Sequence, residues 1–245
     1  MSSLTRYFES IAAVLEKVAR TQEQNMIRAA ELITQTIIAG GMVHIFGTGH
    51  SHILAEECFY RAGGIVPVNA MLEESLMLHT GALQSSRIER LEGYAKIIMD
   101  KYDISNEDTI IIVSNSGKNA VPVEMALEAK KRGLTVIALT SLAQSIESEP
   151  SHPSGKRLFD LADVILDNCG VFGDALMEID GFPGKVGPTS TITGAAILHG
   201  IMYLAVKELM ARGITPPIFM SGNIPGGDEH NEKLLKKYRL RMRHL

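Results

Sequence analysis

Short apolar runs that alternate with helical segments are the feature that most constrains the fold of this chain. Each run is long enough for one buried strand, and helical periodicity fills most of the gaps between the runs. Strands that are connected through helices form parallel sheets with both faces covered. We therefore predict an α/β fold, a doubly wound five-stranded parallel sheet flanked by helices. The predicted strands are MVHIF, GIVPV, DTIIIV, LTVIALT and ADVILD.

The other periodic segments are predicted helices. They cover residues 4–39, 51–63, 86–102, 120–133 and 189–213 and the end of the basic tail, whereas residues 168–190 read as irregular. Ser51 is the expected N-cap of the helix over 51–63. No shift in composition and no internal repeat marks a second domain. We expect a single domain over 1–245 with a core of about 21–213, extended by the helix at 4–39 and by a loop and helix at 214–245. One of the extensions could pack on a second copy of the chain.

Composition and charge disfavour several classes of function. The 245 residues carry a net charge of −4, which disfavours non-specific binding to nucleic acid, and no tryptophan is present for base stacking. The two cysteines, Cys58 and Cys169, do not form a zinc-binding spacing. No uncharged apolar run reaches the ~18 residues of a membrane span, and no signal-peptide pattern is visible. We expect a cytoplasmic protein with reduced thiols that contacts neither nucleic acid nor membrane.

Hydroxyl-rich loops follow the predicted strands. Open parallel sheets bind ligands beyond the carboxyl ends of their strands, where helix N-termini offer free N–H groups to an anion. Serine and threonine are also ordinary N-caps, but their recurrence at several equivalent strand ends favours a ligand. The pattern predicts a small molecule whose phosphate is held by hydroxyl and backbone groups. The predicted binding residues are Gly47, Thr48, Gly49, His50, Ser51, Ser114, Asn115, Ser116, Gly117, Lys118, Asn119, Thr140, Ser141, Thr189, Ser190 and Thr191.

Two common phosphate motifs fit the first loop, GTGHSH, poorly. A P-loop requires Gly-Lys followed by Ser or Thr, and this loop has no lysine. A dinucleotide fingerprint requires a third glycine where His52 stands and an acidic residue at the end of the second strand, and the sequence provides neither. We therefore predict no cofactor.

The pairing of GTGHS with SNSGKN, each after a strand, resembles the SIS (sugar isomerase) domain family of phosphosugar-binding proteins. The second loop of that family reads Ser-x-Ser-Gly, which Ser114, Ser116 and Gly117 match. The resemblance covers about residues 21–213 and is strongest to the phosphoheptose isomerase branch, whose first loop is Gly-Asn-Gly-Gly-Ser-His. It implies a flavodoxin-like five-stranded sheet, a sugar phosphate bound near Ser51 and Asn119, and a homodimer or homotetramer with sites near the interface.

The zinc site of the phosphoheptose isomerases transfers poorly to this sequence. The resemblance places its His, Glu, Gln and His ligands at Glu57, Arg61, Thr191 and His199, so that only the last is retained. We therefore predict no metal. A second branch, the N-acetylmuramic acid 6-phosphate etherases, carries a Glu-Cys pair on the helix after its first loop, and Glu57 and Cys58 form such a pair here.

Two residues are the predicted acid–base catalysts. Aldose–ketose isomerisation requires a base that removes a proton next to a carbonyl and an acid that returns one. Glu57 is the predicted base, because it lies six residues after Ser51 and under two helical turns into the helix. His199 is the second predicted catalytic residue, although a core histidine would also suit its apolar neighbours.

These residues together predict a metal-independent sugar-phosphate isomerase of the phosphoheptose isomerase type. Two alternatives stay open. An amino-sugar-phosphate lyase or etherase also removes a proton next to a carbonyl, and a phosphosugar sensor would keep the loops without catalysis. The glycine-rich segment from Ser221 to Asn231 is either a flexible linker or a loop that closes over a site.

Overall fold

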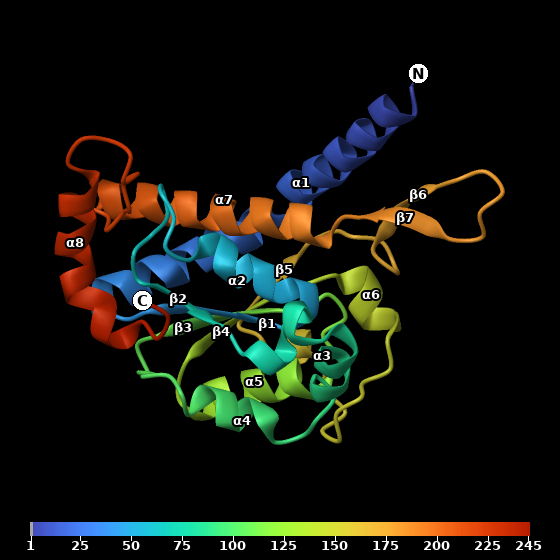
Figure 1. Ribbon diagram of the computed structural model, residues 1–245, viewed down its shortest axis with the longest axis horizontal. Coiled ribbons are helices and arrows are strands. Elements are labelled where there is room, and N and C mark those ends of the chain that lie inside the picture. The colour runs from blue at the N-terminus through green and yellow to red at the C-terminus, as the bar shows by residue number, and fades with distance from the viewer. Residues whose placement is uncertain (1) are drawn as a thin grey trace.

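The computed structural model describes residues 2–245 and has the predicted α/β architecture (Figure 1). Five parallel strands form the central sheet in the order β2-β1-β3-β4-β5. The strand order reverses between β1 and β3. In such folds a ligand-binding crevice opens at the carboxyl ends of the two strands where the order reverses. The strands are β1 (Val43–Gly47), β2 (Val68–Met71), β3 (Thr109–Val113), β4 (Thr135–Thr140) and β5 (Val164–Asp167).

Helices cover both faces of the sheet, as Figure 1 shows, with α1, α2 and α7 on one face and α4 and α5 on the other. Successive strand residues point to opposite faces. Ile111 and Val113 accordingly pack in the core beneath α1, α2 and α7, whereas Ile110 and Ile112 pack in the core beside α4 and α5. The helices are α1 (Ser3–Ala39), α2 (His52–Cys58), α3 (Ala82–Ile88), α4 (Tyr94–Met99), α5 (Ala120–Lys131), α6 (Leu142–Glu147), α7 (Ser190–Ala211) and α8 (Gly227–Tyr238).

Helix α7 is, by length and composition alone, apolar enough to cross a membrane. In the structure it packs lengthwise on α1 and also touches α2. Ile197, Leu198 and Ile201 are fully buried in this packing. Its apolar composition is therefore that of a helix which forms part of the core.

The second strand begins four residues later than predicted. The run GIVPV (64–68) does not form β2, because Val66 donates its N–H to the carbonyl of Pro217, and Ile65 forms an antiparallel bridge with Ile218. The C-terminal segment therefore takes the backbone groups that would have extended the sheet. Val68 is the first residue to pair with β1.

Two predicted helices are shorter than expected. The helix predicted over 51–63 is α2, which ends at Cys58, and Ser51 makes no side-chain capping hydrogen bond. The amphipathic helix predicted over 86–102 is interrupted at Gly93, whose φ of 80° is left-handed and whose N–H is held by the Glu124 carboxylate. Helical periodicity continues through this break, so the sequence pattern did not reveal it.

Residues 168–190, predicted to be irregular, contain an antiparallel hairpin of β6 (Ala175–Glu178) and β7 (Lys185–Pro188). The hairpin projects from the body beside the N-terminal end of α1 (Figure 1). Neither strand buries one face completely. The sequence therefore lacks the alternation of apolar and polar residues that marks a strand.

The C-terminal tail packs on the body, and the second half of the segment 221–231 forms the start of α8. The Asn231 side chain accepts from the N–H of Met220 and donates to its carbonyl, at 2.8 Å each, and α8 begins at Gly227. Beyond α8, Arg241 donates to the fully buried carboxylate of Asp108 at 2.6 Å. His44 lies 3.0 Å from the same carboxylate, which ties the tail to the amino ends of β1 and β3.

Candidate functional site

The first loop turns tightly over the end of β1 because Gly47 has no side chain. A Cβ atom at Gly47 would stand 2.5 Å from both the carbonyl carbon and the carbonyl oxygen of Ser51. The N–H of Ser51 donates to the carbonyl of Thr48 at 2.9 Å, which closes the turn. His52 is buried beneath the loop, with its ring bonded to the carbonyl of Gly49. The loop therefore presents His50 and Ser51 at the carboxyl end of the sheet.

The second loop is also shaped by a glycine. Gly117 has a φ of 59°, and a Cβ there would lie 3.1 Å from the Ser145 hydroxyl and 3.4 Å from the Thr140 hydroxyl. Its N–H donates to the hydroxyl of Ser114 at 3.2 Å. Thr140 is fully buried and donates to the carbonyl of Asn115. Ser114 and Thr140 therefore fix the shape of the loop from beneath.

Other predicted groups in the second loop are available to a ligand. The side-chain oxygen of Asn119 is buried and has no hydrogen-bond partner among residues 2–245. An unpaired buried acceptor costs about 1–3 kcal/mol, so a ligand that donates to it would recover that loss. The Ser116 hydroxyl forms no hydrogen bond within this described range, and Lys118 forms no ion pair there; both side chains are half-buried.

A narrow crevice joins the strand ends and the start of α7, with room for roughly one water-sized group at about 20 Å³. Asn115 and Asn168 face each other in it, with the amide of Asn168 donating to the oxygen of Asn115 at 2.8 Å. Its polar lining consists of His50, Ser51, Asn115, Asn168, Ser190 and Thr191. Residues from the loops after β1 and β3 and from the start of α7 are thus brought together at the carboxyl ends of the strands.

Three further predicted hydroxyls, those of Ser141, Thr189 and Ser190, also have partners inside the protein. Ser141 is fully buried, accepts from the N–H of Gln144 and donates to the carbonyl of Gly170. At the N-terminus of α7, the Asp174 carboxylate accepts from the N–H and hydroxyl of both Thr189 and Ser190, at 2.6–3.2 Å. The prediction that Thr189 and Ser190 bind the phosphate of a ligand is therefore wrong, because the Asp174 carboxylate already occupies their donor groups. Of the three predicted hydroxyls at this helix end, only that of Thr191 is left for a ligand.

Glu89 is a site residue that the sequence analysis missed. Its carboxylate accepts from the Thr48 hydroxyl at 2.8 Å, and its backbone carbonyl accepts from the N–H of Val121 at the start of α5. The residue therefore links the first loop to the helix behind the second loop. Nothing in its local sequence marks this role. Asn168 was also missed, although the strand-end rule that selected the other loops applies to the position after β5 as well.

The two predicted catalytic residues form a direct pair. Nε2 of His199, on α7, lies 2.8 Å from Oε1 of Glu57, on α2, although 142 positions separate them in the chain. Arg61, one turn beyond Glu57, donates from Nη1 to the same carboxylate and to the Glu57 carbonyl. All three side chains are partly exposed, at 36–46%. The pair is open to solvent and to a ligand.

Hydrogen bonding holds Glu57 in its ionised form. The bond from His199 lowers the pKa of the Glu57 carboxyl. Burial opposes this effect, and the positive charge of Arg61 adds to the lowering. A carboxylate with a lowered pKa is a weak base. An ionised carboxylate only accepts hydrogen bonds, so Nε2 of His199 donates to Glu57; in the neutral imidazole the other nitrogen, Nδ1, is then an acceptor.

This set of side chains does not fit the zinc site of the phosphoheptose isomerase branch. The Arg61 guanidinium forms an ion pair with the Glu57 carboxylate. It also places a positive charge where the phosphoheptose isomerase branch has an anionic zinc ligand. Among residues 2–245, no group of three or more His, Cys, Asp and Glu side chains could hold a metal ion. The sequence-based expectation that no metal takes part stays a prediction.

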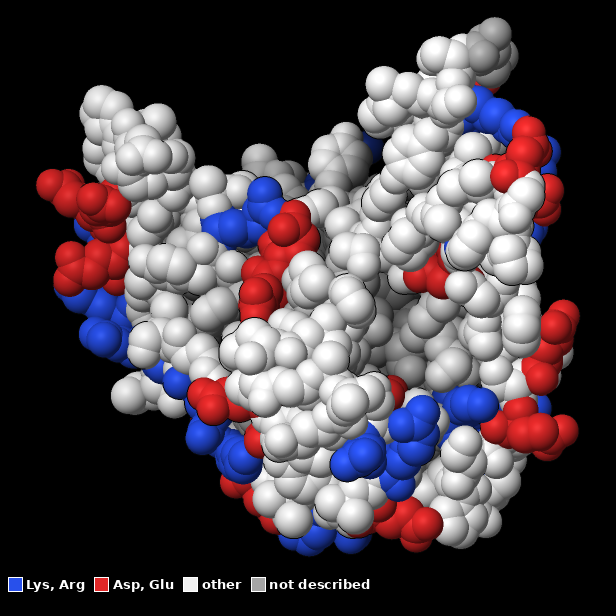
Figure 2. All heavy atoms as spheres, turned by 45° about the vertical axis from the view of Figure 1, so that its right-hand side comes forward, with Lys and Arg blue, Asp and Glu red and all other residues white. Residues whose placement is uncertain are grey.

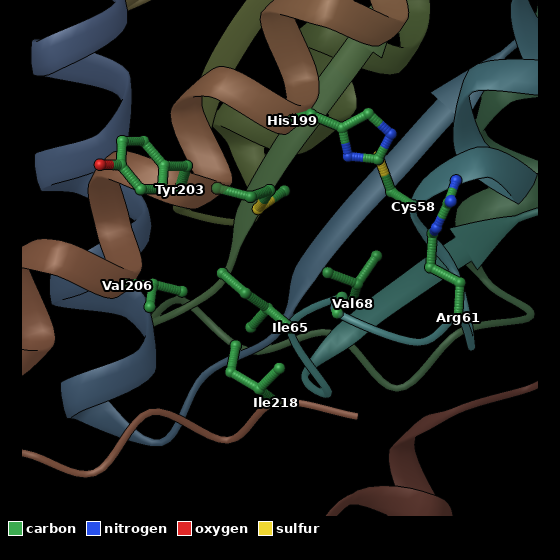
Figure 3. Close-up of a pocket in the computed structure, with 11 residues that line it drawn as sticks. Cys58, Arg61, Ile65, Val68, His199, Tyr203, Val206 and Ile218 are labelled. Atoms are coloured by element: carbon green, nitrogen blue, oxygen red, sulfur yellow. The ribbon is translucent and has the colours of Figure 1, made fainter. Parts of the chain in front are cut away.

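The crevice and the Glu57–His199 pair lie at different points along the packed helices α2 and α7. Thr191 and His199 are eight residues apart on α7, which corresponds to about 12 Å along the helix axis. His199 and Arg61 also line a separate cavity of about 310 Å³ (Figure 3). Figure 3 shows His199 close to Cys58, with Arg61 beside them and the aliphatic side chains Val206 and Ile218 further along.

Charge is mixed over the face of the molecule shown in Figure 2. Acidic and basic side chains alternate around its margin, and the hollow between the two projecting parts is lined mostly by uncharged residues. This face carries no continuous basic surface of the kind that binds nucleic acid.

Comparison with known proteins identifies relatives along the whole chain. A family model described as SIS domain matches residues 6–141. A UPF0309 protein of Caldanaerobacter subterraneus subsp. tengcongensis is 46% identical, over 99% of this chain and 100% of the relative. A UPF0309 protein of Geobacillus thermodenitrificans is 43% identical, over 98% of this chain and 96% of the relative.

Solved structures share the fold at low sequence identity. A phosphoheptose isomerase from Francisella tularensis superposes with a TM-score of 0.56 at 20% identity, covering 84% of this chain and 100% of that chain. A phosphoheptose isomerase from Neisseria gonorrhoeae gives the same TM-score, 0.56, at 15% identity, over 83% of this chain and 97% of that chain. These likenesses show a common architecture.

Proposed function

Because this chain belongs to the SIS-domain family and, within it, to the UPF0309 proteins, we propose that it binds a sugar phosphate and isomerises it without a metal. The observation that carries the proposal is the hydrogen-bonded Glu57–His199 pair, which lies on the same two helices, α2 and α7, whose N-terminal ends border the crevice. An acid–base pair beside a polar anchoring site is what aldose–ketose isomerisation requires.

The phosphate is anchored at the mouth of the crevice in this proposal. The crevice itself has room for roughly one water-sized group, so the phosphate sits outside it, against the free groups of the second loop. Ser116 and Lys118 have donors available there, and the unpaired oxygen of Asn119 accepts from a sugar hydroxyl. The open-chain sugar then extends over the surface of α2 and α7 towards His199.

The geometry gives the pair roles that differ from those expected from sequence. His199 is the base, because its Nδ1 is the acceptor that remains when Nε2 donates to Glu57. Glu57 orients the ring and stabilises the imidazolium that forms. His199 removes a proton from the hydroxyl-bearing carbon next to the carbonyl and returns it to the former carbonyl carbon. The carbonyl oxygen takes a proton from water and the hydroxyl releases one to water, while the Arg61 guanidinium stabilises the negative charge that develops on oxygen.

Deuterium exchange tests this reaction before the sugar itself is identified. The protein is incubated in D2O with a panel of aldose and ketose phosphates, and the carbon-bound protons next to the carbonyl are followed by NMR. We expect deuterium at that carbon for at least one compound, and no exchange with the His199→Ala variant. Binding without any exchange would refute the isomerase and favour a sensor, and release of a substituent would identify a lyase.

We also propose that the protein is a homo-oligomer. The N-terminal end of α1 and the β6–β7 hairpin project beyond the body (Figure 1), and they expose Phe8 at 62% and Phe182 at 53%. Exposed apolar side chains that cluster on projecting elements mark contacts between chains. Sedimentation velocity tests the proposal: a dimer or tetramer is expected, and Phe8→Glu is expected to shift it towards the monomer.

A further inference from the structure

Arg61 reaches the Glu57 carboxylate although the two residues do not share a helix. Helix α2 ends at Cys58, and the backbone of Phe59 is extended. Even so, Nη1 of Arg61 donates to both the carboxylate and the backbone carbonyl of Glu57. The regular spacing of a helix therefore does not place the guanidinium. The turn that joins Phe59 to Arg61 has to return it.

Tyr60, the residue in this turn, has a strained backbone. Its φ of 46° lies in the left-handed region. A bulky residue rarely adopts this conformation, because its Cβ crowds the carbonyl oxygen that follows. Such strain persists only where the surrounding structure holds it, and it is common at functional sites.

The C-terminal segment holds this turn from the outside. The Tyr60 ring packs edge-on against the Phe219 ring, with the ring centroids 5.2 Å apart. Phe219 is buried. Its N–H donates to the carbonyl of Gly64 at 2.9 Å, and its carbonyl accepts from the N–H of Gly63 at 2.8 Å. The ring contact and the two backbone bonds therefore fix the chain on both sides of Arg61.

Gly64 gives the Arg61 side chain the room that this arrangement needs. The N–H of Gly64 donates to the carbonyl of Arg61 at 3.0 Å. A Cβ at Gly64 would lie 3.1 Å from that carbonyl oxygen and also 3.1 Å from Cγ of Arg61. The stem of Arg61 thus lies against a position that has no side chain.

We propose that Tyr60, held by the Phe219 ring, is a positioning residue that keeps the Arg61 guanidinium on the Glu57 carboxylate. This inference rests on the proposed function, in which Arg61 stabilises the negative charge that develops on oxygen. A donor of this kind is most effective when it is already in place and does not reorganise during the reaction. Tyr60 acts through the turn that carries Arg61, and not through contact with the sugar.

Three substitutions at Tyr60 separate the ring from the backbone conformation. Tyr60 is 57% exposed, so its replacement leaves the core intact. Alanine keeps the strain but loses the ring that offsets it, glycine loses the ring but permits the turn, and phenylalanine keeps the ring. In the deuterium-exchange assay, we expect Tyr60→Ala to lower the rate by about a hundredfold. We expect a smaller loss in Tyr60→Gly and the native rate in Tyr60→Phe.

A double variant distinguishes positioning from a general loss of structure. Tyr60→Ala combined with Arg61→Met should be no slower than Arg61→Met alone, because both changes remove the same donor. Independent losses that multiply in the double variant would overturn the inference. Equal losses in Tyr60→Gly and Tyr60→Ala would overturn the role of the left-handed backbone, and a native rate in Tyr60→Ala would overturn the proposal as a whole.

Crystal structures of the native protein and of Tyr60→Ala follow Arg61 without any substrate. The guanidinium is expected to leave the Glu57 carboxylate in Tyr60→Ala and to stay on it in Tyr60→Phe. An unmoved guanidinium in Tyr60→Ala would overturn the inference and leave the proposed function standing. Absence of exchange in the native protein with every sugar phosphate is a different result, because it would refute the proposed function itself.

Discussion

The substitution Gly47→Ala tests whether the first loop must keep its present shape for ligand binding. The new Cβ would stand 2.5 Å from the carbonyl carbon and oxygen of Ser51, about 1 Å short of the normal 3.5–4.0 Å contact between carbon atoms. Both opposing atoms belong to the backbone, so the loop has to move by about that amount. Displacement of a positioning group by 1 Å costs on the order of a hundredfold in activity.

Gly41→Ala is the matched control at the other end of the same strand. A Cβ at Gly41 would stand 2.5 Å from the carbonyl oxygen of Glu107, a clash of the same kind, but at the edge of the sheet away from the loops. We expect each substitution to lower the free energy of unfolding by about 1–3 kcal/mol, the usual cost of overpacking.

The assay is calorimetric binding of a sugar phosphate, with urea unfolding of each variant to separate binding from stability. Gly47→Ala is expected to weaken binding by about 10- to 100-fold, the effect of losing one hydrogen bond to a charged ligand group, and Gly41→Ala is expected to leave it within a factor of about two. The steric reasoning is refuted if both variants lose the same stability and bind the ligand equally well.

Three further predictions concern charged groups. Turnover is expected to fall by ~10²–10⁴-fold in His199→Ala. Adding Glu57→Gln to that variant should lower turnover little further, because the two residues act as a unit. Additive losses in a double-mutant cycle would contradict this prediction. Hydrogen bonds from His44 and backbone N–H groups outweigh burial and lower the pKa of Asp108 to about 2. Asp108 therefore stabilises the fold above about pH 4 and loses this contribution as the pH falls through about 2. In acid-unfolding curves, the stability advantage of the native protein over Asp108→Asn should shrink by about 2 kcal/mol across that range, and a constant difference would refute the assignment. Replacement of the capping carboxylate by Asp174→Ala should lower the free energy of unfolding by about 1 kcal/mol in urea titrations, and an unchanged midpoint would show that the cap contributes nothing.

The sequence identified the architecture because its signals are local. The apolar run DTIIIV and the helices on either side of it specify a buried parallel strand without reference to the rest of the chain. The strand-end rule then located the hydroxyl loops. The prediction of a strand from an apolar run was wrong at residues 64–67. There the distant segment Pro217–Phe219 takes the backbone hydrogen bonds that the sheet was expected to take.

The sequence also selected Glu57 and His199 but could not show that they meet. Their contact depends on how α2 packs against α7, and 142 positions of chain lie between them. Arg61 meets the same carboxylate from four residues further along the chain. Our proposal that His199 is the base and Glu57 the orienting group rests on the contact between α2 and α7.

The sequence by itself determined a parallel sheet whose strand ends carry glycines and hydroxyls, since these follow from periodicity and from residue type. Only the tertiary structure decided which polar groups are free. The Ser141 hydroxyl caps a helix, the Asp174 carboxylate takes the hydroxyl of Ser190 at the start of α7, and the Asn119 side-chain oxygen has no partner among residues 2–245. The physical reason is that a hydrogen bond requires two groups at about 3 Å. Neighbours in the chain fix the type of group at each position, but the packing of distant elements decides whether its partner is the protein or a ligand.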